Sequence, residues 1–246
     1  MLRSGNPALT AKSFDVRRSQ GEGTMTLEGT VNKTGLALLI LMTTAALTWN
    51  GLLPPVVLVP ALILSLFAGL VVGLLIYFKP ATAPIATPIY AALKGVLLAT
   101  ISMQFEKRFP GIVINAVGLT FGTLAALLLA YRSGLIRATE NFKLGLFAAT
   151  GGIFLLYLVS MVMGFFGRSI PFIHDATPIG IAFSVFVVII AALNLVLDFD
   201  FIERGAAQGA PKYMEWYGAF GLLVTLVWLY LEILRLLAKL QGRDRR

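Results

Sequence analysis

Seven long apolar stretches constrain the fold of this chain more than any other feature of its sequence. A helix needs about 20 residues to cross the roughly 30 Å hydrocarbon core of a bilayer, because each residue adds about 1.5 Å. Most of the stretches reach that length, and they cover residues 35–52, 56–78, 85–104, 112–131, 144–166, 177–199 and 216–239. The sequence therefore predicts an all-α membrane protein built as a bundle of seven transmembrane helices.

The amino-acid composition supports a membrane protein and excludes several classes of site. Hydrophobic residues make up 58% of the chain and charged residues 13%, whereas a soluble domain has about 45–50% apolar and about 25% charged residues. The chain has no cysteine, which excludes disulfides, thiolate catalysis, zinc–cysteine sites and iron–sulfur clusters. Its single histidine, His174, excludes a multi-histidine metal site, and we interpret His174 and Asp175 as a solvated loop pair. We therefore expect neither an enzyme nor a bound cofactor.

The excess of basic residues indicates membrane topology rather than nucleic-acid binding. The formal net charge is +8, and the basic residues lie in tails and short loops, where they orient the spans and meet anionic lipid headgroups. Their distribution favours a multi-pass protein of the cell (inner) membrane with a cytoplasmic N-terminus. Seven complete crossings would then put the basic C-terminus outside. Either this tail is a tolerated exception or the last stretch does not cross completely.

Three segments are expected along the chain. Residues 1–34 are expected to form a polar, partly disordered N-terminal tail. We do not expect a cleaved signal peptide, because there is no apolar stretch near Met1. Residues 35–240 form the transmembrane domain, and residues 241–246 form a basic C-terminal tail.

Small residues spaced four apart recur in the apolar stretches and indicate close helix packing. We favour packing inside the bundle over dimerisation, and the oligomeric state stays open. The pairs are Gly69 with Gly73, Gly118 with Gly122, and Ser160 with Gly164.

Charged residues inside the apolar stretches are the candidates for function. An Asp at the centre of a membrane helix costs about 2.5–3.5 kcal/mol on insertion scales, so such residues tend to have a use or a partner. Glu232 and Arg235 are three residues apart in the last stretch, which puts them on one helix face where they can pair. Two readings of Glu232 stay open: an ion pair that only anchors the helix, or a titratable carboxylate that faces the bundle interior.

An acidic segment ends the sixth stretch and suggests a cation site. Asp198 directly follows the apolar run LNLVL, and Asp200 and Glu203 follow it closely. Because calcium prefers oxygen ligands, we take Asp198 and Asp200 as candidate metal ligands, with Glu203 as a third. The alternative is that Asp200 solvates a loop and Glu203 is a surface acid. Lys94, midway along the third stretch, needs a partner of its own, and Glu232 is the candidate.

The C-terminal part of the chain carries a family resemblance. The runs LNLVLDFDFIERG and GAPKYMEWYGAFGLLVTLVWLYLEILRLL are its most specific part, and SGNPALTAKSF and YFKPATAPIATPIYAALKG extend it. Together they make the chain resemble the Bax inhibitor-1/YccA (TMBIM) family, especially its bacterial Bax-inhibitor-1-like branch. The resemblance covers nearly the whole sequence and implies a seven-helix fold with the last helix central.

The resemblance also implies a function, a pH-sensitive calcium leak gated by two intramembrane acids. LVLDF matches the first acid to Asp198, and WLYLE matches the second to Glu232, where the family usually has Asp. Two close carboxylates can share a proton, which makes such a pair sensitive to pH. The family's basic latch maps to Lys79, where a bacterial relative has arginine, and Lys94 and Arg235 are further charge partners. Lysine lacks the bidentate fork of arginine, which favours a weaker or differently aimed latch.

The same resemblance carries an alternative function. YccA-like relatives suggest a regulator that transports nothing and binds another membrane protein, such as a membrane quality-control protease. The expected partners are thus the lipid bilayer and either calcium as the transported ion or a membrane protein, and no nucleic acid.

Overall fold

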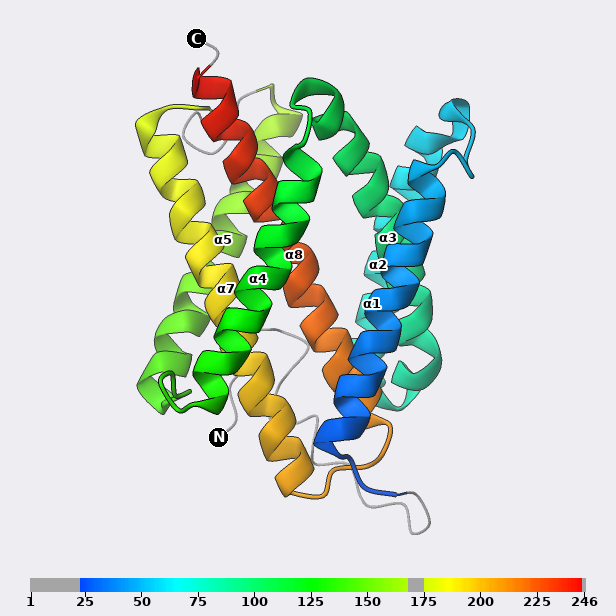
Figure 1. Ribbon diagram of the computed structural model, residues 1–246, viewed down its shortest axis with the longest axis vertical. Coiled ribbons are helices and arrows are strands. Elements are labelled where there is room, and N and C mark those ends of the chain that lie inside the picture. Colours follow the sequence, from blue (N-terminus) through cyan, green and yellow to red (C-terminus); the bar gives the residue numbers. More distant parts are fainter. Residues whose placement is uncertain (1–22, 168–174, 245–246) are drawn as a thin grey trace. The chain divides into compact units, whose positions relative to one another are not determined.

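The computed structural model describes residues 23–167 and 175–244. Within these ranges, seven helices are long and apolar enough to cross a membrane, which confirms the predicted fold class. His174 and residues 1–22 of the predicted tail lie outside the described ranges. In chain order the elements are α1 (Leu27–Trp49), α2 (Pro55–Phe78), the short 3-10 helix η2 (Pro80–Thr82), α3 (Ala83–Arg108), α4 (Ile112–Arg132), α5 (Glu140–Phe165), α7 (Pro178–Ala207) and α8 (Met214–Asp244) (Figure 1).

Two helices extend well beyond the predicted apolar stretches. α1 begins at Leu27 rather than at residue 35, because the Thr26 side chain caps it by accepting a hydrogen bond from the Gly29 N–H at 3.0 Å. α7 continues past residue 199 to Ala207. An ion pair between Arg204 and Asp200, four residues apart, supports these added turns. Hydropathy does not predict the start of α1 or the end of α7, because both segments contain polar residues.

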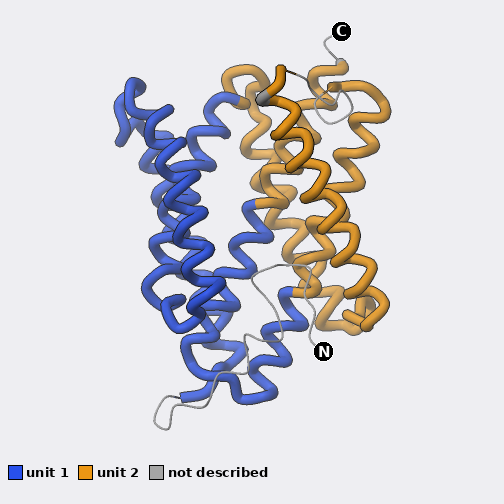
Figure 2. Tube along the Cα trace, turned by 180° about the vertical axis from the view of Figure 1, so that it is seen from behind, with its two compact units in different colours: residues 1–2, 6–104, 198–227 blue, residues 3–5, 105–197, 228–246 orange. Residues whose placement is uncertain are grey.

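The chain divides into two compact units, coloured separately in Figure 2. The described part of unit 1 comprises residues 23–104 and 198–227, which include α1, α2 and most of α3. The described part of unit 2 comprises residues 105–167, 175–197 and 228–244, which include α4 and α5. α7 and α8 each contribute one part to either unit.

Glycines bring the helices of unit 1 close together. Gly69 of α2 lies against the Lys94 side chain of α3, and Gly73 lies against Tyr90. The predicted role of this glycine pair in packing within the protein is therefore confirmed. In contrast, a Cβ added at Gly118, Gly122 or Gly164 would meet no described atom within 4 Å, so these three glycines do not make such contacts.

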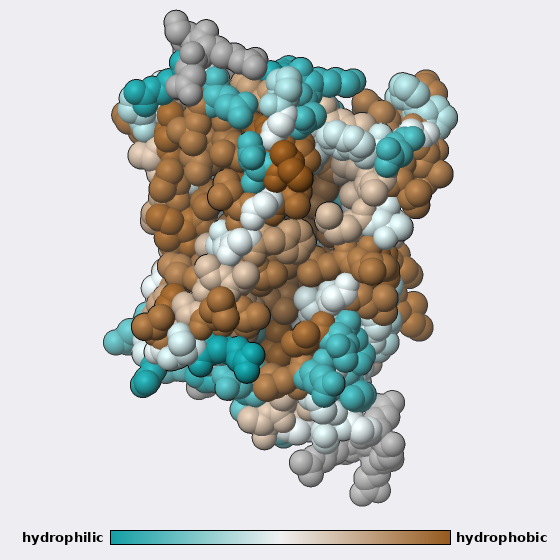
Figure 3. Space-filling model, in the orientation of Figure 1, coloured by the Kyte–Doolittle hydropathy of each residue, from teal (hydrophilic) through white to brown (hydrophobic). Residues whose placement is uncertain are grey.

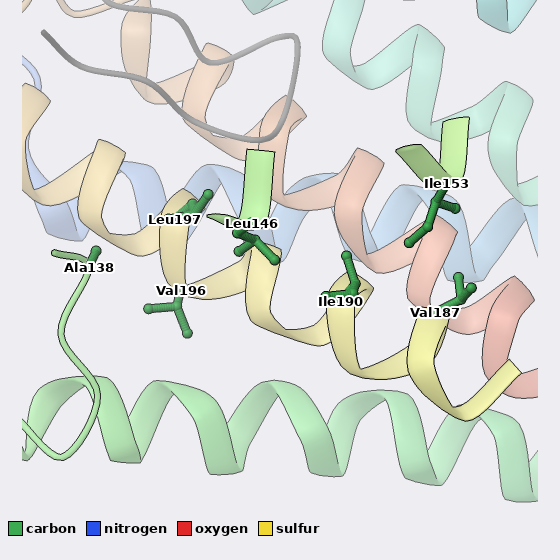
Figure 4. Close-up of a cluster of buried hydrophobic side chains, with 7 residues drawn as sticks. All are labelled: Ala138, Leu146, Ile153, Val187, Ile190, Val196 and Leu197. Atoms are coloured by element: carbon green, nitrogen blue, oxygen red, sulfur yellow. The ribbon is translucent and has the colours of Figure 1, made fainter. Parts of the chain in front are cut away.

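The hydrophobic core of unit 2 joins α5 to α7 (Figure 4). Its buried side chains come from both helices and from the segment before α5, and they are Ala138, Leu146, Ile153, Val187, Ile190, Val196 and Leu197. Because lipid tails are as apolar as these side chains, van der Waals packing rather than the hydrophobic effect holds such helices together.

α8 is the most buried of the spans. Within its most apolar window 67% of the residues are buried, against 56% in α3, 44% in α7 and 11–17% in the other four spans. This burial agrees with the expected central position of the last helix. In each unit, Figure 3 shows hydrophobic side chains along the middle of the helices and hydrophilic ones toward their ends, as a bilayer requires.

The closest helix approach in unit 1 generates a prediction about stability. A Cβ at Gly95 of α3 would overlap the Thr44 hydroxyl and the Leu41 carbonyl of α1. Because a helix backbone cannot yield as a side chain can, Gly95→Ala should lower the free energy of unfolding by about 1–3 kcal/mol. Thermal unfolding in detergent measures this, with Gly122→Ala as the control. An unchanged midpoint for Gly95→Ala would contradict the packing described.

Candidate functional site

Asp198 is a fully buried carboxylate in a membrane-spanning helix. Its exposed fraction is 0%, and it follows Leu195, Val196 and Leu197, which are 0–2% exposed. Because α7 continues to Ala207, Asp198 lies within the helix rather than at its end. An ionisable group in this setting is a functional candidate by default.

Asp200 and Glu203 do not join Asp198 in one ligand set. Successive helix residues are about 100° apart, so side chains two positions apart point to different sides of α7. Asp200 accepts a hydrogen bond from Arg204 Nε at 3.0 Å, and Glu203 is exposed. Among the residues that the structure describes, no group of three or more His, Cys, Asp or Glu side chains is arranged to hold a metal ion. The three acids suggested by the sequence therefore do not converge.

Glu232 is the centre of a polar network in unit 2. Its exposed fraction is 2%, and its carboxylate accepts hydrogen bonds from Tyr157 Oη at 3.1 Å, from Trp228 Nε1 at 3.3 Å and from Arg235 at 3.0 Å. The predicted pairing of Glu232 with Arg235 is thus present in the structure. Arg235 balances the buried negative charge.

Arg235 also contacts Tyr157, through both the hydroxyl and the aromatic ring. Arg235 donates to Tyr157 Oη at 2.7 Å, and its guanidinium carbon lies 5.2 Å from the centre of the Tyr157 ring. The hydroxyl of Tyr157 thus accepts from the cation and donates to Glu232. The side chain of Arg235 is 38% exposed, so this buried carboxylate is linked through one residue to the surface of the unit.

The two lysines expected as latch or charge partner have no carboxylate partner in the described part of the chain. Lys94 Nζ lies 5.1 Å from the centre of the Tyr90 ring, and its side chain packs on Gly69. A ring face is a weaker partner than a carboxylate. Lys79 caps the end of α2 with an exposed side chain. Asp198, Lys79 and Lys94 belong to unit 1, whereas Glu232 has its hydrogen-bond partners in unit 2.

Glu215 is a buried carboxylate that sequence reasoning missed. It lies in the first turn of α8 with an exposed fraction of 0%. It pairs with Lys33 of α1 and with Lys212 at 2.8 Å, and it accepts hydrogen bonds from the Thr26 N–H at 3.0 Å and the Thr26 hydroxyl at 2.8 Å. The spacing of Lys212 and Glu215 was readable in the sequence. The partners from α1 were not, because they lie more than 180 residues away.

A second missed residue is Lys239, which is 5% exposed near the end of α8. Its ammonium group donates to the Gly180 carbonyl and the Ser184 hydroxyl, each at 2.9 Å. These bonds join the last part of α8 to the first part of α7 within unit 2. Lys239 ends the last apolar stretch of the sequence, and hydropathy alone does not indicate that its side chain is buried.

Comparison with known proteins adds one finding. A family model described as Bax inhibitor 1 like matches residues 6–242. The match includes every candidate residue discussed above, from Thr26 to Lys239. Comparison with curated proteins gave no match.

The Tyr157–Glu232–Arg235 network predicts a coupled effect on stability. Tyr157→Phe removes one donor to a buried charge and should lower the free energy of unfolding by about 1.5–3 kcal/mol. In a Glu232→Gln background the same change should cost less, because the charge is gone. Thermal unfolding of the four proteins in detergent measures the coupling, and Tyr77→Phe is the control, since the Tyr77 hydroxyl makes no hydrogen bond within the described residues. Equal costs in both backgrounds would contradict the network.

Proposed function

This chain belongs to the Bax inhibitor 1-like family, and from that premise we propose that it is a pH-sensitive leak for calcium, or for cations of similar chemistry. The observation that carries the proposal is the burial of Asp198 and Glu232 within membrane-spanning helices. Carboxylates are costly in that environment and commonly mark ion or proton pathways. The proposal includes a multi-pass protein in the cell membrane with its N-terminus in the cytoplasm.

Asp198 is the proposed gate. Its carboxylate attracts a cation when ionised and loses that attraction when it binds a proton. A change of one full charge in a region of low dielectric alters the energy of a passing cation strongly, because few water dipoles screen it. The fully buried position of Asp198 supports this role, and the exposure of Glu203 on the same helix makes Glu203 a natural control.

Glu232 is the proposed second pH-sensing group, with Arg235 as its charge partner. Protonation of Glu232 would leave the positive charge of Arg235 without its counter-charge. The Tyr157 hydroxyl and the Trp228 N–H would then lose a charged acceptor, which weakens both hydrogen bonds. The proposed consequence is a rearrangement of this network when the pH falls.

Lys79 and Lys94 have weaker support in the proposal. The latch role of Lys79 rests on family resemblance alone. Lys94 contributes a positive charge inside unit 1, on the face of Tyr90, and we propose that it raises the barrier for a cation nearby. Neither Asp200 nor Glu203 is part of the proposed gate, since Asp200 is already paired with Arg204 and Glu203 is exposed.

The proposal predicts a pH-dependent calcium efflux from proteoliposomes that contain the purified protein and a calcium dye. Between pH 6 and pH 8 the efflux of the wild-type protein should change by up to about tenfold per pH unit, the limit for one titrating proton. Asp198→Asn should remove this dependence because the side chain can no longer exchange a proton. Glu232→Gln should shift or flatten it.

The matched control for these variants is Glu203→Gln, which changes an exposed acid on the same helix and should leave the pH profile intact. A pH-dependent efflux that survives in Asp198→Asn would exclude Asp198 as the gate. If folded wild-type protein gives no efflux at any pH, the leak is excluded. The alternative is then a regulator that binds another membrane protein, such as a quality-control protease.

A further inference from the structure

The start of α8 is bound to the start of α1 through a buried charge cluster. Glu215 forms ion pairs with Lys33 and Lys212, and it accepts hydrogen bonds from the N–H and the hydroxyl of Thr26. Lys33 is 22% exposed and Lys212 is 48% exposed, while Glu215 is fully buried. A single carboxylate therefore joins α1, the connector between α7 and α8 (residues 208–213), and α8 itself. All of these residues belong to unit 1.

Backbone contacts reinforce the same junction. The Met25 N–H donates to the Ala210 carbonyl at 2.7 Å, and Thr24 forms an antiparallel bridge with Pro211. Met25 is 2% exposed. The segment before α1 is thus paired with the connector as one short rung of a β-ladder, which is unusual in an otherwise helical protein.

The junction is also tightly fitted on its other sides. Gly29 leaves no room for a Cβ beside the Glu215 carboxylate, and a Cβ on Gly218 would come within 3.1 Å of both Thr30 and Ile202. The Trp216 carbonyl accepts a hydrogen bond from Thr87 of α3 at 3.3 Å. The start of α8 therefore cannot move without breaking contacts to α1 and α3.

A buried ion cluster of this kind is a poor source of stability, because the cost of removing the charges from water offsets most of their attraction. The cluster instead defines the position of the start of α8, because its hydrogen bonds are directional and all of them meet at one carboxylate. The connector that it holds follows directly on the part of α7 that carries Asp198 and the Asp200–Arg204 pair. A displacement of the start of α8 away from α1 would therefore break bonds of the cluster.

We propose that Glu215 is a positioning residue, and that it forms a clamp with Thr24, Met25, Thr26, Lys33 and the connector. This clamp must open for the leak to conduct. This inference rests on the proposed function. The structure represents the clamped state, in which α8 is held against α1. Gating in helical proteins commonly proceeds by displacement of whole helices, and this clamp opposes such a displacement at the start of α8.

A reversible crosslink tests the clamp directly. The chain has no cysteine, so Thr24→Cys with Pro211→Cys introduces the sole thiol pair. Antiparallel neighbours have Cα atoms about 4.5–5.5 Å apart, which suits a disulfide. In calcium-loaded proteoliposomes, the oxidised protein should lose about nine tenths of its efflux, a change of about 1.4 kcal/mol. Reduction should restore the efflux in the same vesicles. Equal efflux before and after reduction would overturn the proposal.

Weakening the clamp should have the opposite effect. Glu215→Gln keeps an acceptor for Thr26 but loses both ion pairs, and it should raise efflux about five- to tenfold, as expected for the loss of charged hydrogen bonds. The pH of half-maximal efflux should stay that of the wild type, because Asp198 is unchanged. Lys212→Met is a milder second variant with the same expected direction. Glu28→Gln, an exposed acid on α1, is the control. A leak that loses its pH dependence would indicate simple misfolding and would overturn the positioning role.

Hydrogen exchange separates the clamp from the leak. In Glu215→Gln the Met25 amide should exchange at least about tenfold faster than in the wild type, since its opening becomes easier. This readout does not need calcium flux. If neither the wild type nor the reduced double-cysteine protein conducts, the proposed function fails, and faster exchange still supports the clamp as a structural junction. Unchanged exchange at Met25 would overturn the clamp itself.

Discussion

Hydrocarbon offers a charged side chain no hydrogen-bond partner, and the polar interior of this protein is organised by that constraint. Glu215 is surrounded by two lysines and Thr26, and Glu232 by Tyr157, Trp228 and Arg235. Each acid obtains its partners from other helices or from one helical turn away. The bonds of these acids link α1 to the start of α8, and α5 to the later part of α8.

The two buried acids of α8 have different surroundings, and this difference suggests different roles. Glu215 joins separate chain segments and lies in the first turn, where the helix dipole also favours a negative charge. Glu232 lies deeper, within a network that stays inside unit 2 and reaches the surface through Arg235. The first arrangement supports the proposed positioning role of Glu215, and the second supports the proposed response of Glu232 to pH. Asp198 adds a third buried acid, on α7.

Burial differs sharply between the helices, and it is greatest in α8 and α3. α3 and α8 carry most of the close contacts, through Gly95, Gly218 and the ring pair of Tyr90 with Phe220, whose centres are 4.9 Å apart. α2 and α5 expose long apolar side chains along most of their length, as expected for helices that face lipid. Function is therefore best sought on the helices with buried polar groups, α7 and α8.

The sequence by itself determined the seven spans and the Glu232–Arg235 pair, because both depend on length, hydropathy and spacing within one helix. It did not reveal that α1 begins at Leu27, since the polar turns of that helix are stabilised by Glu215, which is 182 residues from Lys33. It also did not reveal the Tyr157–Glu232 bond or the packing of the Lys94 side chain against Gly69 of α2. The tertiary structure decided these contacts, because the partners of each buried charged group come from helices that are distant in the sequence. Only the packing of those helices brings the partners close.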